Sequence, residues 1–175
     1  MDYSNNDNLL IQGYFTTALL VELKNANFLN SEYYKSRQFQ DKFVQDNLPT
    51  VGIDNQGALL MVLYMLLVVP RQLLETKFPT EFHSINDDVE KLAASTTSSY
   101  KKDAQGVDHV RHLRNAVSHA RVNFTQDGTV TFRDEDGQGS IWEATFPLSN
   151  IGHLLTSLQV IFMKYVESVK GGFRA

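Results

Sequence analysis

Apolar residues recur every three or four positions along most of the chain, which is the spacing of helices with one buried face. The pattern predicts helices over Leu9–Val21, Ser31–Gln45, Asp54–Lys77, Ser84–Ala94 and Gln105–Arg121, and a last helix from Pro147. Proline inside a helix removes a backbone donor, so Pro70 is expected to kink or divide the third segment. The polar segment Ala94–Lys102 is predicted to be a loop.

The period of the pattern changes before the last helix. Val122–Phe124, Val130–Phe132 and Ile141–Phe146 are short and rich in β-branched and aromatic residues, and Asp127-Gly128 is a hairpin turn signal. The fold class is therefore mainly α, a helical bundle with a small antiparallel hairpin or three-stranded insert at about 122–146. Since no long Pro/Gly/Ser linker interrupts the chain, we expect a single domain over 1–175.

The longest apolar run is the twelve-residue segment Ala58–Val69. A membrane-spanning helix needs about 20 apolar residues, so this segment is predicted to be a helix buried on all sides within the bundle, and no membrane is expected as a partner.

Composition limits the function classes. Apolar residues make up 42% of the 175 positions, which is enough for a globular core and excludes a disordered chain. Cysteine is absent, which excludes disulfides, thiolate metal sites and a cysteine nucleophile. The N-terminus lacks the features of a secretory signal, and we expect a cytoplasmic protein. The formal charge of −4 means that binding to nucleic acid needs a local basic patch.

Such a patch is predicted at His109–Arg121, where thirteen residues include three arginines, three of the chain's five histidines and no acid. On a helical wheel, the apolar residues form one stripe for the core. The opposite, polar half carries the candidate site residues Arg111, His112, Arg114, Asn115, Ser118, His119 and Arg121. Arg111, Asn115 and His119 are successive i, i+4 neighbours, so cationic donors lie beside a group that titrates near neutral pH. Taken type by type, these residues also fit an ordinary solvated helix face.

The stretch from Arg111 to Arg121 resembles the signature helix of the HEPN superfamily. In that helix an arginine, usually followed by a polar residue, precedes a histidine in an Arg-x(4 to 6)-His spacing. Here Arg114 is followed by Asn115 and, after three more residues, by His119. A late motif helix, a long apolar helix and a β-hairpin before the final helix are also similar to some HEPN families, so the resemblance implies a HEPN-like bundle.

The resemblance implies a metal-independent endoribonuclease without cofactors, a toxin or defence component, acting on RNA as a homodimer with two motif helices at one cleft. In it, His119 serves as general acid or base, Arg114 stabilises the phosphate, and Asn115 orients the 2′-OH or a phosphate. Arg111, His112, Ser118 and Arg121 are expected as substrate contacts. A further implied partner is a nucleotidyltransferase-type antitoxin.

Two kinds of alternative stay open. The first is a non-catalytic HEPN-type dimer that binds a nucleotide, RNA or a partner protein with the same face. The second is a metal site. His109 and His112 have ligand spacing but lack a nearby helical carboxylate, and the acidic loop Asp134–Gly137 lacks the spaced ligands of a calcium loop, so we predict no metal.

Overall fold

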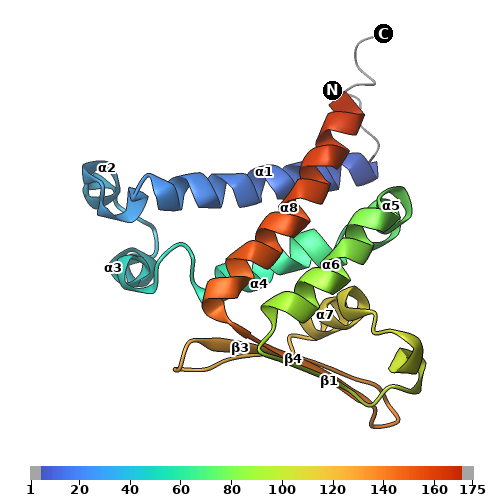
Figure 1. Ribbon diagram of the computed structural model, residues 1–175. Coiled ribbons are helices and arrows are strands. Elements are labelled where there is room, and N and C mark those ends of the chain that lie inside the picture. Colours follow the sequence, from blue (N-terminus) through green and yellow to red (C-terminus); the bar gives the residue numbers. More distant parts are fainter. Residues whose placement is uncertain (1–4, 171–175) are drawn as a thin grey trace. The chain divides into compact units, whose positions relative to one another are not determined.

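The computed structural model describes residues 5–170, with side chains over 7–70 and 73–169 (Figure 1). The chain divides into two compact units, Met1–Val62 and Leu63–Ala175. Helices predominate in its secondary structure, which confirms the mainly α fold class. Compactness alone does not define a folding domain, so the single domain over 1–175 stays a prediction.

The first unit is helical. Its elements are α1 (Asn5–Asn25), η1 (Phe28–Asn30), α2 (Glu32–Ser36), α3 (Lys42–Val51) and most of α4 (Gln56–Leu63). The single helix predicted over Ser31–Gln45 is wrong, because the chain leaves helical geometry between α2 and α3. The Asp41 carboxylate caps α3 by accepting the backbone N–H groups of Phe43 at 2.9 Å and Val44 at 3.3 Å.

A small aromatic cluster anchors this unit. Tyr34 is buried between the rings of Phe28 and Phe39, both in edge-on contact, and its hydroxyl donates to the Gln45 carbonyl at 3.0 Å. These contacts tie η1, α2 and α3 together.

The second unit contains the predicted signature segment. Its elements are η2 (Tyr64–Val68), α5 (Arg71–Lys77), α6 (Pro79–Leu92), β1 (Ser95–Ser98), η3 (Lys101–Gln105), α7 (His109–Ser118), β2 (Val122–Phe124), β3 (Thr129–Glu135), β4 (Ile141–Pro147) and α8 (Leu148–Lys170). The predicted break at Pro70 is confirmed, since α5 starts immediately after it. The helix predicted from Ser84 starts earlier, at Pro79, where proline occupies its first turn.

The apolar run Ala58–Val69 is only partly buried. Leu63, Leu66 and Leu67 are buried, whereas Met61 and Tyr64 are exposed, so burial on all sides is wrong. Within the described residues, no single helix has both the length and the apolarity to cross a membrane. One bent pair, Lys42–Val51 with Gln56–Val68, meets these criteria only when the two are taken together.

The sheet is antiparallel in the order β1-β4-β3-β2. Strands β2, β3 and β4 confirm the predicted insert. The loop predicted over Ala94–Lys102 is wrong, because β1 pairs with β4 in this segment; the N–H of Ala94 donates to the Thr145 carbonyl and that of Ser99 to the Ile141 carbonyl, both at 2.8 Å. All four side chains of β1 are exposed, so no alternating pattern marks the strand.

Helices α6, α7 and α8 cover one face of the sheet (Figure 1). The residues of β3 and β4 that point to this face are buried: Val130, Phe132, Asp134, Trp142, Ala144 and Phe146. Asp134 is the charged member of that set, and it faces α7 through the contacts described below.

Candidate functional site

Helix α7 is shorter than predicted. It starts at His109, where the Asp108 carboxylate caps it by accepting the N–H of Arg111 at 3.0 Å, and it ends at Ser118 rather than at Arg121. The predicted apolar stripe is confirmed for Val110, Leu113, Ala116 and Val117, which are all buried. Ala120, placed on the same stripe, is exposed at a φ of 52°, because the helix has already ended.

Arg114 does not project into solvent. Its side chain is 5% exposed, its Nε donates to the Leu67 carbonyl at 3.2 Å, and its guanidinium pairs with Glu75. Since η2 and α5 cover this side of α7, the wheel's assignment of Arg114 to an open polar half is wrong. The guanidinium therefore has protein partners where a phosphate-binding role requires an open approach.

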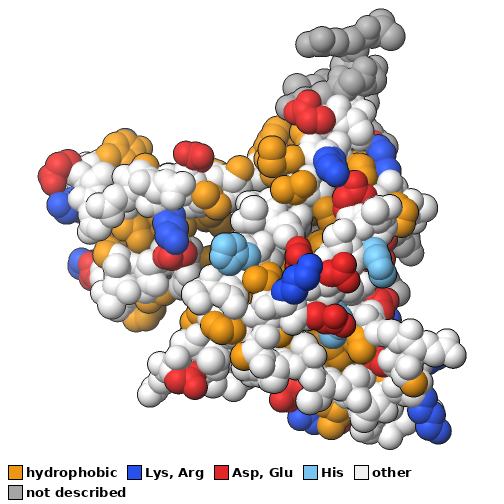
Figure 2. All heavy atoms as spheres, viewed as in Figure 1, with side chains coloured by type: hydrophobic (Ala, Val, Ile, Leu, Met, Phe, Trp, Pro, Cys, Tyr) orange, Lys and Arg blue, Asp and Glu red, His pale blue; other side chains and the backbone are white. Residues whose placement is uncertain are grey.

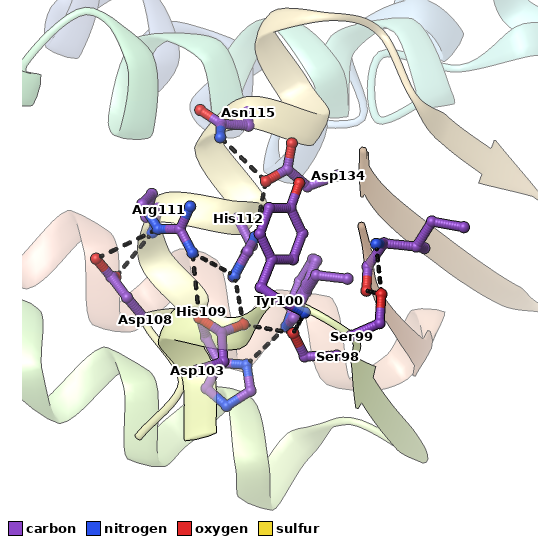
Figure 3. Close-up of polar contacts among 12 residues, drawn as sticks. Ser98, Ser99, Tyr100, Asp103, Asp108, His109, Arg111, His112, Asn115 and Asp134 are labelled. Carbon is purple, nitrogen blue, oxygen red and sulfur yellow. Dashed lines mark hydrogen bonds and ion pairs between the residues drawn. The ribbon is translucent and has the colours of Figure 1, made fainter. Parts of the chain in front are cut away.

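His112 is the centre of a buried polar cluster, which also contains Asp103, Asp134, Tyr100 and Arg111 (Figure 3). Its ring is fully buried, with Nδ1 2.7 Å from Asp134 and Nε2 2.9 Å from Asp103. The ring stacks on Trp142 at 5.1 Å between centroids, and Tyr100 lies on it at 4.7 Å. The His112 ring is thus surrounded by Asp134, Asp103, Trp142 and Tyr100. Through these contacts it links α7 to β3, to β4 and to the segment after β1.

Charges within the cluster are paired. Arg111 donates from Nη2 to Asp103 at 3.2 Å, and Ser98 donates to the same carboxylate. Burial raises the pKa of the Asp103 carboxyl, but hydrogen bonds from Ser98 and His112 outweigh this effect and hold that pKa below its ordinary value of 3.8. Burial, with the charge and hydrogen bonding of Asp134, raises the pKa of the Tyr100 hydroxyl to about 12.

His109 is a second buried histidine. Its Nδ1 accepts from the indole N–H of Trp142 at 3.2 Å, and Nε2 lies 3.4 Å from Glu90. Burial lowers the pKa of His109, although Glu90 acts in the opposite direction. The lowered pKa favours the neutral ring, whose Nδ1 can accept the hydrogen bond from Trp142. Both ring nitrogens of His109 and of His112 are engaged within the protein, so the two side chains are not available as a pair of metal ligands.

Asn115 lies one helical turn before His119, whose backbone N–H donates to the Asn115 carbonyl at 3.0 Å. The side-chain Nδ2 of Asn115 donates to Asp134 at 3.0 Å, and the residue is half-buried. This side chain joins the buried cluster to the solvent-facing part of α7.

Ser118, His119 and Arg121 are the exposed candidates, grouped at the C-terminal end of α7. Among the described residues, the His119 ring has no hydrogen-bond or ion-pair partner, while Arg121 donates from Nη1 to the Glu135 carbonyl at 2.8 Å. An open groove of about 530 Å³ begins at Ala120 and Arg121 and continues over the outer face of the sheet, past Asn123, Thr131, Arg133 and Glu143.

Comparison with protein families matches residues 1–168 to the HEPN pEK499 p136 family. The chain belongs to this HEPN family. The superfamily inferred from the signature segment is therefore confirmed. No curated protein and no solved structure matched the chain.

In this HEPN chain, the acidic partners of α7 could not be predicted from the spacing within the helix. Asp103, Asp108, Asp134 and Glu75 come from outside the helix and contact Arg111, His112, Asn115 or Arg114. Arg111 and Arg114 of the acid-free window are thus paired with acids that lie outside α7. On the face that Figure 2 shows, acidic and basic side chains of the described residues are intermixed. The acidic loop predicted from Asp134 starts later, because β3 continues to Glu135, and the alternation along β3 turns Asp134 to the buried face.

Proposed function

We propose that this HEPN protein is a metal-independent endoribonuclease that acts in the cytoplasm, with its reaction at the exposed C-terminal end of α7. The observation that carries the proposal is the contrast among the histidines of the signature segment. His109 and His112 are buried with both ring nitrogens engaged, whereas His119 is exposed beside Ser118 and Arg121. An imidazole that meets solvent at such a position can exchange protons with a bound substrate.

The proposed reaction is transesterification within RNA. A base takes the proton of the ribose 2′-OH, O2′ attacks the adjacent phosphorus, and the P–O5′ bond breaks as O5′ receives a proton. The products are a 2′,3′-cyclic phosphate and a 5′-hydroxyl end. His119 is the group that we assign to proton transfer, and the extra negative charge of the phosphorane needs cationic donors nearby.

We assign the cationic donors by exposure. We assign phosphate contact to Arg121 and Ser118 because both are exposed, and we assign the strand beyond the phosphate to the groove past Arg133. Arg114 stabilises the phosphorane only if its guanidinium leaves Glu75, so we assign it to holding α7 in position. Arg111 and His112, which are expected substrate contacts from the sequence, have the same positioning role in the buried cluster.

The proposal includes two partners besides RNA. A homodimer would bring two copies of the α7 end to one cleft, and a nucleotidyltransferase-type antitoxin would restrain the activity of a toxin. Both follow from the HEPN resemblance, and they belong to the proposal together with the toxin or defence role.

The test is RNA cleavage by purified protein in the presence and absence of EDTA. We expect cleavage that EDTA does not reduce, products with 2′,3′-cyclic phosphate ends, and an inert all-deoxy substrate. His119→Ala should abolish cleavage and shift the urea midpoint of unfolding little, because the side chain is exposed. His153→Ala, which truncates an exposed histidine on α8, is the matched control and should retain cleavage.

Two results would overturn the proposal. Wild-type rates in His119→Ala would remove the assigned acid or base. Activity that EDTA abolishes and a divalent ion restores would replace the metal-independent reaction with a metal-dependent one.

The pairing of α7 with acids from other elements favours a second candidate, a non-catalytic HEPN-type dimer. Internal neutralisation of Arg111 and Arg114 reduces the charge available for RNA phosphates, as does the net charge of −4. This candidate predicts that the wild-type chain binds a nucleotide, an RNA or a partner protein, that Arg121→Ala weakens this binding, and that no cleavage occurs.

A further inference from the structure

The side-chain amide of Asn115 is held by Asp134. Its Nδ2 lies 3.0 Å from Oδ2 of Asp134, and the same oxygen lies 2.7 Å from Nδ1 of His112. Asp134 is 5% exposed on the inner face of β3, so these partners replace the water it lacks.

This contact fixes which end of the amide faces outward. An ionised carboxylate only accepts hydrogen bonds, so the amide group nearest Asp134 is the NH₂ and the carbonyl oxygen Oδ1 points the other way. Figure 3 shows Oδ1 directed away from Asp134. No described residue donates to Oδ1. No side-chain nitrogen or oxygen among the described residues is both fully buried and unpartnered, so Oδ1 of the half-buried Asn115 keeps some contact with solvent.

An outward Oδ1 is selective for donors. The non-bridging oxygens of a phosphate are acceptors and gain nothing from it, whereas a hydroxyl group can donate to it. We propose that Asp134 is a positioning residue that turns the Oδ1 of Asn115 toward the ribose 2′-OH of RNA. The inference rests on the proposed function and narrows it, because it assigns Asn115 to the hydroxyl and not to the phosphate.

A double-mutant cycle tests the inference. The four proteins are wild type, Asp134→Asn, Asn115→Ala and the double variant, assayed with a short RNA that has one cleavable linkage. Asp134→Asn should lower kcat about tenfold, the scale of one oriented hydrogen bond. In the Asn115→Ala background the same substitution should change kcat by less than about twofold, because its route of action is gone. An equal loss of kcat in both backgrounds would show a merely structural role and overturn the inference.

The matched control is Asp103→Asn. This substitution removes the other carboxylate beside His112. Among the described hydrogen bonds, none joins Asp103 to Asn115. We expect it to lower stability as Asp134→Asn does and to keep kcat within about twofold of wild type. A loss of kcat equal to that of Asp134→Asn would attribute the effect to the whole cluster instead of to the amide.

Failure of the proposed function is distinguished from failure of this inference by the wild-type protein alone. If the wild-type chain cleaves no RNA, the proposed function is wrong and the double-mutant cycle is not carried out. The amide is then tested by binding of matched RNA and DNA oligonucleotides. Asn115→Ala and Asp134→Asn should each reduce the preference for RNA over DNA, and the double variant should reduce it no further. A wild-type chain without that preference, or variants that keep it, would overturn the inference.

Discussion

A charged side chain inside a protein is stable only when its hydrogen-bonding groups are satisfied, and Arg114 meets this condition through two neighbours. Its Nε binds the carbonyl of Leu67 in the π-helical segment η2, and its guanidinium binds Glu75 in α5. The Glu75 side chain is 33% exposed, so the ion pair itself contributes little after solvent screening. The larger contribution comes from the buried carbonyl and from the packed aliphatic stem.

Arg114→Ala should therefore destabilise the protein. Truncation leaves the Leu67 carbonyl without its side-chain donor and leaves a cavity beside η2, and we expect a loss of about 2 to 3 kcal/mol in the free energy of unfolding. Urea unfolding followed by circular dichroism measures it. Arg121→Ala, on an exposed arginine close by, is the control and should cost about 0.5 kcal/mol or less. Equal effects of the two substitutions would mean that Arg114 is not held as described.

The wheel located the apolar stripe of α7 correctly but not the surroundings of its polar half. Periodicity gives the direction in which a side chain leaves the helix axis, so Leu113 and Val117 could be assigned to the core. It carries no information about which other elements pack against the remaining sides. Arg114 and His112 are buried because η2, α5 and β3 pack against them. These elements are distant in the sequence, so their arrangement around α7 depends on the whole fold.

At the scale of elements, the segment that joins β1 to α7 depends on Asp103. This carboxylate sits in η3 and binds Ser98 at the end of β1 as well as His112 and Arg111 in α7. Backbone pairing with β4 holds β1 on one side, and Asp103 holds the following turn on the other.

Asp103→Asn should lower stability at neutral pH, and the difference from wild type should shrink in acid. The folded pKa of Asp103 lies below 3.8, its ordinary value. Its stabilising contribution is therefore complete above that ordinary value and is lost as the pH falls through the lower folded value. Urea unfolding at a series of pH values from neutral down to about 3 measures the difference. Asp87→Asn removes an exposed carboxylate on α6 and should show a smaller difference at every pH.

Strands differ in how far sequence predicts them. Strands β3 and β4 alternate buried and half-buried or exposed residues, and the turn between β2 and β3 has its Asp-Gly signal, so all three strands of the insert could be predicted. Strand β1 reads Ser-Thr-Thr-Ser with every side chain exposed. Its hydrogen bonds to β4 are made by the backbone, which every residue except proline provides, and they leave no trace in the side-chain pattern.

At the scale of the whole molecule, the proposed cleft needs more than one chain. Proton transfer requires both a base for O2′ and an acid for O5′, and His119 is the exposed histidine that the signature segment of one chain supplies. A second copy would supply another His119 and another Arg121, which would double the cationic donors available to the phosphorane. Catalysis would then belong to the pair of chains.

Mixing experiments test this. Wild-type chains combined with increasing amounts of His119→Ala chains, and allowed to exchange subunits, should lose activity per wild-type chain. Random pairing makes the fraction of wild-type homodimers equal to the square of the wild-type fraction, so a site that needs both histidines is inactivated by one variant subunit. Exchange is confirmed with a tagged subunit, and cleavage is measured against mixing ratio. His153→Ala chains are the control, since adding them should not lower the activity per wild-type chain. Constant activity per wild-type chain after complete exchange would mean that one His119 suffices, and sedimentation at the mass of a single chain under assay conditions would rule out the shared cleft.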